Sequence, residues 1–221
     1  KIGEITIAPR KLAGYTSYGM CCSEKEIGIS DANDGIMEIT DDVALGTDLK
    51  SIYQIEDIIF EVDNKSLTNR PDLWGHYGIA REIAALAGRE LKPLPTVDLS
   101  IYNDLGKVDL KIEDPLCQRY SCLQFGNISV HKSPVNMRIR LYYCGMRALN
   151  FLADLTNYLM LEMGQPMHAF DSRKVEKIRI KRFDKPFTFR TLDGVNRAID
   201  ENTLMICNGD TPVAIAGIMG G

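Results

Sequence analysis

The sequence lacks the long apolar runs and the short motifs that mark several classes of protein. No stretch approaches the roughly 18 consecutive apolar residues of a membrane-spanning helix, so we expect no membrane segment. Walker-type glycine loops, GxGxxG, GxSxG and HExxH are also absent. No Ser or Cys nucleophile has a recognisable partner motif, which argues against a conventional covalent hydrolase.

Cysteine is present at six positions but never as a CxxC pair, and no histidine lies at zinc-ligand spacing. Cys117 and Cys122 flank the expected start of a strand, which leaves a disulfide or a metal there as the alternative. Free, buried thiols in a reducing compartment are the preferred interpretation, and they predict a cytoplasmic protein.

Neither end of the chain has the features of a natural terminus. The first residues, KIGEITIAPRK, include no initiator methionine and no signal peptide, and the last, VAIAGIMGG, stop within an apolar, glycine-rich run. We therefore expect the 221 residues to be an excised piece of a longer protein, with room for one large domain or two small ones.

Charge is unevenly distributed around a net value of −4, which argues against nonspecific coating of nucleic acid. Residues 38–63 hold eight acids and one base, and residues 171–190 hold eight bases. Such runs are usually solvated faces. The alternative for the basic run is a place beside a phosphate backbone.

The residue pattern of the first part predicts short strands over residues 2–59, with turns at Ala13-Gly14, Asn33-Asp34-Gly35 and Leu45-Gly46, and a compact strand over residues 57–62. A helix is expected to begin at Pro71 and to stop at Gly88.

The second part is expected to be mixed, with its helices clustered rather than alternating with strands, which indicates the α+β class. One helix follows the N-cap pair Ser133-Pro134 and ends near Gly145, and the next runs from Leu149 to Met163 with a buried leucine stripe. Asp193-Gly194 is expected to turn a hairpin. Strands are expected over residues 108–114, 119–130, 177–183, 187–192, 195–200, 203–208 and 211–217.

Three groups of residues are candidates for a site. In the first, Thr156 and Asn157 interrupt an apolar helix, with Arg147 before it and His168 after it. Thr and Asn inside a helix need hydrogen-bond partners. They either bond the neighbouring backbone or hold a ligand, and His168 is either structural or functional.

The second candidate is the tail GIMGG, whose glycines either let backbone approach a ligand or mark a bend between strands. The third is TNRPDLWGHYGIARE, with Arg70, Trp74, His76 and Arg81. Arginines at a helix start either meet a phosphate or belong to a packed joint between domains.

Four motifs, in order and over almost the whole chain, resemble the beta subunit of bacterial phenylalanine–tRNA ligase. They are GYTSYGMCCSEKEIGI, NRPDLWGHYGIAREIAAL, DLTNYLMLEMGQPMHAFD and AIAGIMGG. The resemblance implies the end of an OB-type tRNA-binding region plus a structural helix over residues 1–92, a linker over 93–106 and an incomplete editing domain over 107–221. In that family the editing domain hydrolyses tyrosine wrongly esterified to phenylalanine tRNA.

The resemblance also implies a site. Asn157 and Thr156 would hold the ester or a water, His168 would orient the water or the terminal ribose, and Arg147 would bind near the 3′ end of the tRNA. The glycine segment, with Gly217, Gly220 and Gly221 as binding residues, would lie near the tyrosine ring. The family completes this pocket with an acidic residue and a Thr/Ala segment beyond Gly221, so full activity is not expected of this piece alone.

The partners implied by the resemblance are tRNA(Phe) and the ligase alpha subunit, in a heterotetramer of two alpha and two beta chains. ATP and magnesium belong to the synthetic reaction of the parent ligase, and no cofactor or metal is expected in this piece. The alternative is a non-catalytic scaffold with a vestigial pocket that docks tRNA and a subunit. A free-standing small-molecule hydrolase fits less well, because the nucleophile motifs are missing.

Overall fold

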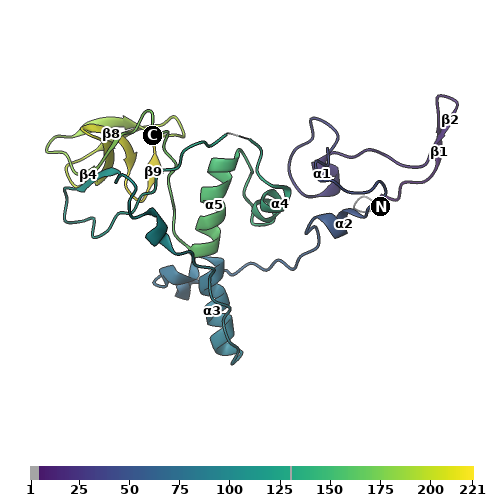
Figure 1. Ribbon diagram of the computed structural model, residues 1–221, viewed down its shortest axis with the longest axis horizontal. Helices are drawn as coiled ribbons and strands as arrows, with labels where there is room; N and C mark the ends of the chain where they lie inside the picture. Colours follow the sequence, from purple (N-terminus) through teal and green to yellow (C-terminus); the bar gives the residue numbers. More distant parts are fainter. Residues whose placement is uncertain (1–4, 130) are drawn as a thin grey trace. The chain divides into compact units, whose positions relative to one another are not determined.

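The computed structural model describes residues 5–129 and 131–221, which form two compact units. The first unit comprises residues up to 87 together with the segment that ends at Met167; the second comprises residues 88–129 and 168–221. Helices dominate the first and strands the second, so the expected mixed α+β class is confirmed (Figure 1). The domain boundaries implied by the resemblance are functional divisions and stay predictions.

The first unit opens with a hairpin of two short antiparallel strands, β1 (Arg10–Leu12) and β2 (Tyr15–Ser17). The predicted turn between them is confirmed, since Ala13 and Gly14 both have positive φ angles, 47° and 86°. Among the described residues up to 87, β1 and β2 are the only strands. The OB-type region that the resemblance implies for this part of the chain stays a prediction.

Two short helices occupy positions where strands were predicted. They are α1 (Glu24–Ile27), which has a capping box between Ser23 and Glu26, and α2 (Leu49–Ile52), which is capped by Asp48. The strand predicted over residues 57–62 is also wrong. Its residues are exposed, Ile58 at 89%, and no neighbouring strand pairs with them. A strand requires a hydrogen-bonded partner, and apolar sequence alone does not supply one.

The predicted helix from Pro71 is confirmed in a modified form. After a 3-10 turn, η1 (Lys65–Leu67), a second 3-10 turn, η2 (Pro71–Leu73), precedes α3 (His76–Leu86). Gly75 is the N-cap of α3, and Gly88, with a φ of 61°, follows the end of the helix as expected.

The two helices expected around residues 135–163 are confirmed as α4 (Val135–Tyr143) and α5 (Phe151–Met163), and α3 and α4 both pack against α5. The N-cap of α4 is Pro134 and not Ser133, because the Ser133 hydroxyl donates to the buried carboxylate of Asp154 instead. The predicted leucine stripe is only half-buried, and Met163 is 45% exposed. The core of this unit forms around Ile29, Tyr53 and Ile139.

The second unit is built on a five-stranded sheet in the order β3-β4-β7-β8-β9. The pairing of β3 with β4 is parallel and the other pairs are antiparallel. A 3-10 turn, η3 (Leu99–Tyr102), lies within the predicted linker. The strands are β3 (Asp109–Ile112), β4 (Lys177–Lys181), β7 (Met205–Asn208), β8 (Thr211–Ile215) and β9 (Met219–Gly220).

A separate antiparallel hairpin joins β5 (Phe187–Arg190) to β6 (Asn196–Ile199) through the predicted Asp193-Gly194 turn. The sheet core is formed by Ile178, Ile180 and Ile206, with Tyr120 and Cys122 packed against it. Residues 119–129 therefore contribute side chains but no strand, contrary to prediction. Residues 2–4 and 130 of the predicted strands lie outside the described residues.

Candidate functional site

The helix that carries the Thr-Asn pair is held firmly at its first turn. Asn150 caps α5 by accepting a hydrogen bond from the Ala153 N–H at 3.2 Å. Asp154, which is 1% exposed, accepts from the Leu149 N–H at 2.7 Å and from the hydroxyl of Ser133. These bonds satisfy N–H groups at the start of the helix that have no partner within it.

Thr156 and Asn157 lie half-buried one turn further along α5. The Thr156 hydroxyl donates to the Ala153 carbonyl at 2.9 Å, which is the local bond to the backbone that the structural interpretation expected. Its oxygen keeps lone pairs that can accept a hydrogen bond. Among the described residues no group is hydrogen-bonded to the Asn157 amide, so that side chain retains its donors and its acceptor.

Arg147 lies in the loop between α4 and α5, where it is exposed. It lines a cavity of about 230 Å³ together with Lys132, Arg138, Glu24 and Asp154. The cavity therefore mixes bases with acids. Within the described chain no acid is paired with Arg147, which leaves its guanidinium available to an anion.

His168 belongs to the second unit and comes four residues after Gly164, the C-cap of α5. Its ring is exposed and stacks on Phe170, with ring centroids 5.8 Å apart. A Cβ atom at Gly220 would lie 3.9 Å from His168 Cε1. The structure thus places His168 beside the glycine tail, and the roles that the resemblance implies for both stay predictions.

The three candidate glycines of the tail are needed for different reasons. Gly217 has a φ of 71° in the turn between β8 and β9. Gly220 and Gly221 are positions of close approach: a Cβ would lie 2.8 Å from Leu192 Cδ1 at the former and 2.1 Å from Phe189 Cζ at the latter. The tail is therefore a bend between strands, and it also brings bare backbone against side chains.

The candidate site residues divide between the two units. Arg147, Thr156 and Asn157 belong to the first, and His168, Gly217, Gly220 and Gly221 belong to the second. Within each unit the geometry is as described above, and whether the two groups form one site stays a prediction.

The candidate cluster around Arg70 is structural. The Arg70 guanidinium donates to both oxygens of Asp72 at 2.9 Å, and Arg81 donates to the same carboxylate at 2.7 Å. These hydrogen bonds hold the pKa of the Asp72 carboxyl far below its usual range. His76 Nε2 lies 3.8 Å from Cys144 Sγ. Because both arginines are already paired, the alternative of a phosphate contact is not favoured.

The basic run of residues 171–190 is likewise partly neutralised. Ion pairs join Arg173 to Asp171, Arg179 to Asp109, Lys181 to Asp210 and Arg182 to Asp114. The hydrogen bonds from Arg173 lower the pKa of Asp171 to about 2. These pairs favour the interpretation of a solvated face.

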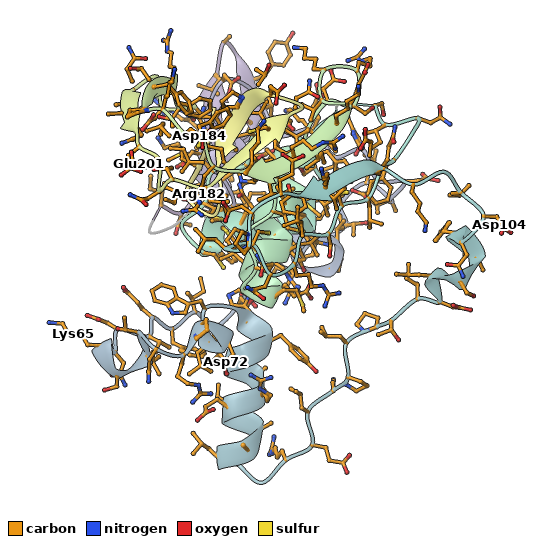
Figure 2. The ribbon with its side chains drawn as sticks, turned by 90° about the vertical axis from the view of Figure 1, so that its left-hand side faces the viewer. Lys65, Asp72, Asp104, Arg182, Asp184 and Glu201 are labelled. Atoms are coloured by element: carbon orange, nitrogen blue, oxygen red, sulfur yellow. The ribbon has the colours of Figure 1, made fainter. Side chains whose placement is uncertain are left out.

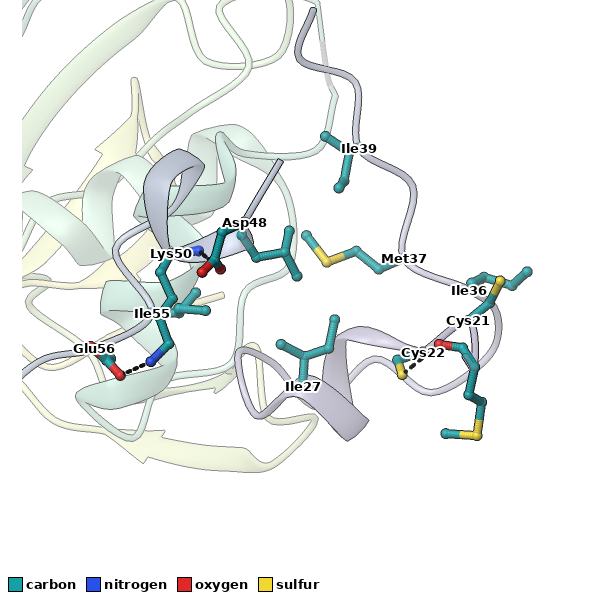
Figure 3. Close-up of a pocket in the computed structure, with 12 residues that line it drawn as sticks. Cys21, Cys22, Ile27, Ile36, Met37, Ile39, Asp48, Lys50, Ile55 and Glu56 are labelled. Atoms are coloured by element: carbon teal, nitrogen blue, oxygen red, sulfur yellow. Dashed lines mark hydrogen bonds and ion pairs between the residues drawn. The ribbon is translucent and has the colours of Figure 1, made fainter. Parts of the chain in front are cut away.

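A larger cavity, of about 600 Å³, lies in the first unit beside α1 and α2 and contains none of the candidate residues. Figure 3 shows Ile27, Met37 and Ile55 around it, with the Lys50–Glu56 ion pair at its edge. Its lining is mainly apolar and sulfur-rich, with Asp48, Lys50 and Glu56 as its charged members. Sequence reasoning gave no signal for it, because its lining comes from segments that were predicted as strands.

All six cysteines are free thiols, so the alternative of a Cys117–Cys122 disulfide is wrong. Only Cys207 is fully buried, and Cys21 and Cys144 are exposed, contrary to the general expectation of buried thiols. In the described part of the chain, no group of three or more His, Cys, Asp or Glu side chains is arranged to hold a metal ion. None of the described helices is long and apolar enough to span a membrane.

Comparison with known proteins gives consistent matches. Residues 116–221 match the B3/4 domain. The chain is 41% identical over 224 aligned positions to the phenylalanine--tRNA ligase beta subunit of Clostridium tetani, covering 99% of this chain and 28% of the relative. The beta subunits of Leptospira interrogans (38% identity, 100% and 28% covered) and Syntrophus aciditrophicus (40%, 99% and 28%) match similarly.

The chain thus spans little more than a quarter of the length of these relatives, and the match runs along the whole of it. The motifs on which the resemblance rested therefore lie within one continuous similarity. Along its whole length the chain is therefore similar to a segment of phenylalanine–tRNA ligase beta subunits, and its residues 116–221 are similar to the B3/4 domain.

Proposed function

We propose that this chain is the proofreading part of a phenylalanine–tRNA ligase, where it hydrolyses tyrosine wrongly esterified to tRNA(Phe). The observation that carries the proposal is the place of His168, which follows the helix of Thr156 and Asn157 and lies against Gly220 of the tail. The similarity to phenylalanine–tRNA ligase beta subunits supports the ligase context. Under this proposal the parent protein works in the cytoplasm with an alpha subunit, and uses ATP and magnesium for aminoacylation.

A second site of this kind raises the accuracy of a ligase that charges phenylalanine. A synthetic pocket shaped for an apolar ring cannot strongly reject an isostere that adds one hydroxyl group. A pocket that hydrogen-bonds the hydroxyl discriminates well, because phenylalanine would leave its buried polar groups unpaired.

The proposed reaction is attack of a water molecule on the carbonyl carbon of the aminoacyl ester. Water loses a proton, and the terminal ribose oxygen leaves as the ester bond breaks and takes up a proton. The ester is already activated, so positioning and polarisation are sufficient without a protein nucleophile. The unbonded amide of Asn157 and the lone pairs of Thr156 would hold the ester or the water, and His168 would orient the water or the ribose. Arg147, which has no acidic partner among the described residues, would bind near the 3′ end of the tRNA.

The test is the rate of deacylation of Tyr-tRNA(Phe) and of Phe-tRNA(Phe) by the full-length subunit with its companion chains. We expect faster loss of tyrosine than of phenylalanine, and a lower rate for His168→Ala. Glu201→Ala is the control, since Glu201 is an exposed residue of the same unit as His168 and is not among the candidate site residues. An unchanged rate in His168→Ala would remove His168 from the mechanism.

The second candidate function is a non-catalytic scaffold that docks tRNA and a subunit. One observation favours it: the Thr156 hydroxyl is already bonded to the helix backbone, as a purely structural threonine would be. Binding of tRNA without hydrolysis of either ester in the same assay would support the scaffold and reject the proofreading proposal.

A further inference from the structure

The end of α5 and the start of α3 meet through the backbone of two glycines. A Cβ atom at Gly75 would lie 2.3 Å from the Gly164 nitrogen and 2.7 Å from the Met163 carbonyl carbon. A Cβ atom at Gly164 would lie 3.2 Å from the Gly75 nitrogen and 3.5 Å from the Pro71 oxygen. The two helix ends are therefore in direct contact, main chain against main chain.

A residue with a Cβ atom does not fit at either position of this contact. The atoms that a Cβ at Gly75 would meet are backbone atoms, which cannot rotate aside as the end of a flexible side chain can. Gly164 also has a φ of 73°, a conformation that strains residues with a Cβ. A substitution at either position has to move one helix end relative to the other.

The segment on which α5 rests is itself braced (Figure 2). A Cβ at Gly78 would lie 1.5 Å from the Asp72 carbonyl oxygen, so η2 is packed closely on the first turn of α3. The Asp72 carboxylate is shared by Arg70 and Arg81, and Arg70 also reaches Glu82 at 3.1 Å. These ion pairs are partly exposed, so their role is geometric more than energetic.

We propose that Gly75, held by the segment from Arg70 to Gly78, is a positioning residue for the deacylation reaction. It fixes the end of α5, the helix of Thr156 and Asn157, and the point from which the chain leaves towards His168. This proposal rests on the proposed function. It assigns a role to the NRPDLWGH segment that phosphate binding does not explain.

The test is Gly75→Ala in the full-length protein that contains this segment, assembled with its companion subunits. Displacing a catalytic helix by about 1 Å reduces a rate by up to about 10²-fold, so we expect a loss of ten- to a hundredfold in kcat for hydrolysis of Tyr-tRNA(Phe). The KM for the mischarged tRNA and the rate of aminoacylation should stay within twofold. The matched control is Gly19→Ala, where a Cβ meets nothing within 4 Å and φ is not positive.

Hydrogen–deuterium exchange gives a second measurement that does not depend on activity. Amides of residues 161–168 should exchange faster in Gly75→Ala and at the normal rate in Gly19→Ala. Asp72→Asn keeps both glycines but weakens the ion pairs of Asp72 with Arg70 and Arg81. It should lower kcat and speed up exchange at residues 161–168, each by less than Gly75→Ala does. If Gly75→Ala does not fold, Asp72→Asn takes its place in both measurements.

Normal kcat or normal exchange in Gly75→Ala would overturn the positioning role. An unsubstituted enzyme that does not hydrolyse Tyr-tRNA(Phe) is a different result: it rejects the proposed function and, with it, the role in deacylation. The exchange rates then show on their own whether the glycine contact holds the end of α5.

Discussion

The ion pair between Arg138 and Glu24 is the contact in the first unit whose loss we expect to cost most. Arg138 Nη1 lies 2.7 Å from Glu24 Oε1, and the two side chains are only 14% and 12% exposed. In Arg138→Met the Glu24 carboxylate stays largely buried without its counter-ion. Breaking a buried pair from one side costs about 3–5 kcal/mol. We expect about 3 kcal/mol, because the Ser30 hydroxyl still donates to Glu24 at 2.7 Å.

The loss should depend on pH. Burial by itself raises the pKa of the Glu24 carboxyl, but hydrogen bonds from Arg138 and Ser30 outweigh it and leave the pKa below its ordinary value. A lowered pKa in the folded state means that the pair stabilises the fold fully above the unfolded value of about 4.3. That contribution is lost as pH falls through the lower folded value. The difference between the parent chain and Arg138→Met should therefore shrink on acidification.

Urea unfolding followed by circular dichroism at pH 7 and at pH 3 measures both effects. The control is Arg140→Met on the same helix, where the arginine is exposed and bonds Tyr158 and Gln54; its loss should cost less than about 1 kcal/mol. A cost below about 1 kcal/mol for Arg138→Met at pH 7, or an equal cost at both pH values, would refute the reasoning.

The remaining predictions concern single buried groups. Burial raises the pKa of the Cys207 thiol to about 11, so iodoacetamide at pH 8 should alkylate it far more slowly than the exposed Cys21, as peptide mass spectrometry would record. Burial and the hydrogen bond to Asp41 raise the pKa of Tyr53 to about 12, so the stability that this shift contributes is complete below about pH 10 and falls as pH rises towards 12. Tyr53→Phe should reduce the ultraviolet phenolate change near pH 12 by the share of one tyrosine. Asp154→Ala removes the acceptor of two hydrogen bonds at the start of α5 and should cost about 2–4 kcal/mol in urea unfolding, whereas a cost near zero would show that water replaces it.

The elements that were predicted correctly are those whose signals lie within a few residues. The Asp193-Gly194 turn specifies its hairpin, and Gly164 ends α5 by adopting the left-handed conformation that glycine tolerates. The site residues carried over from the resemblance also came from local motifs. The bond of Thr156 to the Ala153 carbonyl is also local and was one of the two alternatives, whereas the lack of a partner for Asn157 among the described residues depends on how α5 is packed.

Two strands that were predicted wrongly have one physical cause. Residues 57–62 and 119–129 have the composition of strands but form none, since a strand exists only where another segment offers its backbone groups. The parallel pairing of β3 with β4 joins residues nearly seventy positions apart, and no local sequence pattern predicts it.

The sequence by itself determined the three longest helices and the turns at Ala13-Gly14 and Asp193-Gly194, because neighbouring residues specify them. Tertiary structure alone decided that Gly75 meets Gly164, that Gly220 lies beside His168, and that Arg70 and Arg81 are occupied by Asp72. The physical reason is that close approach and charge pairing are properties of distance in space, to which separation along the chain is a poor guide.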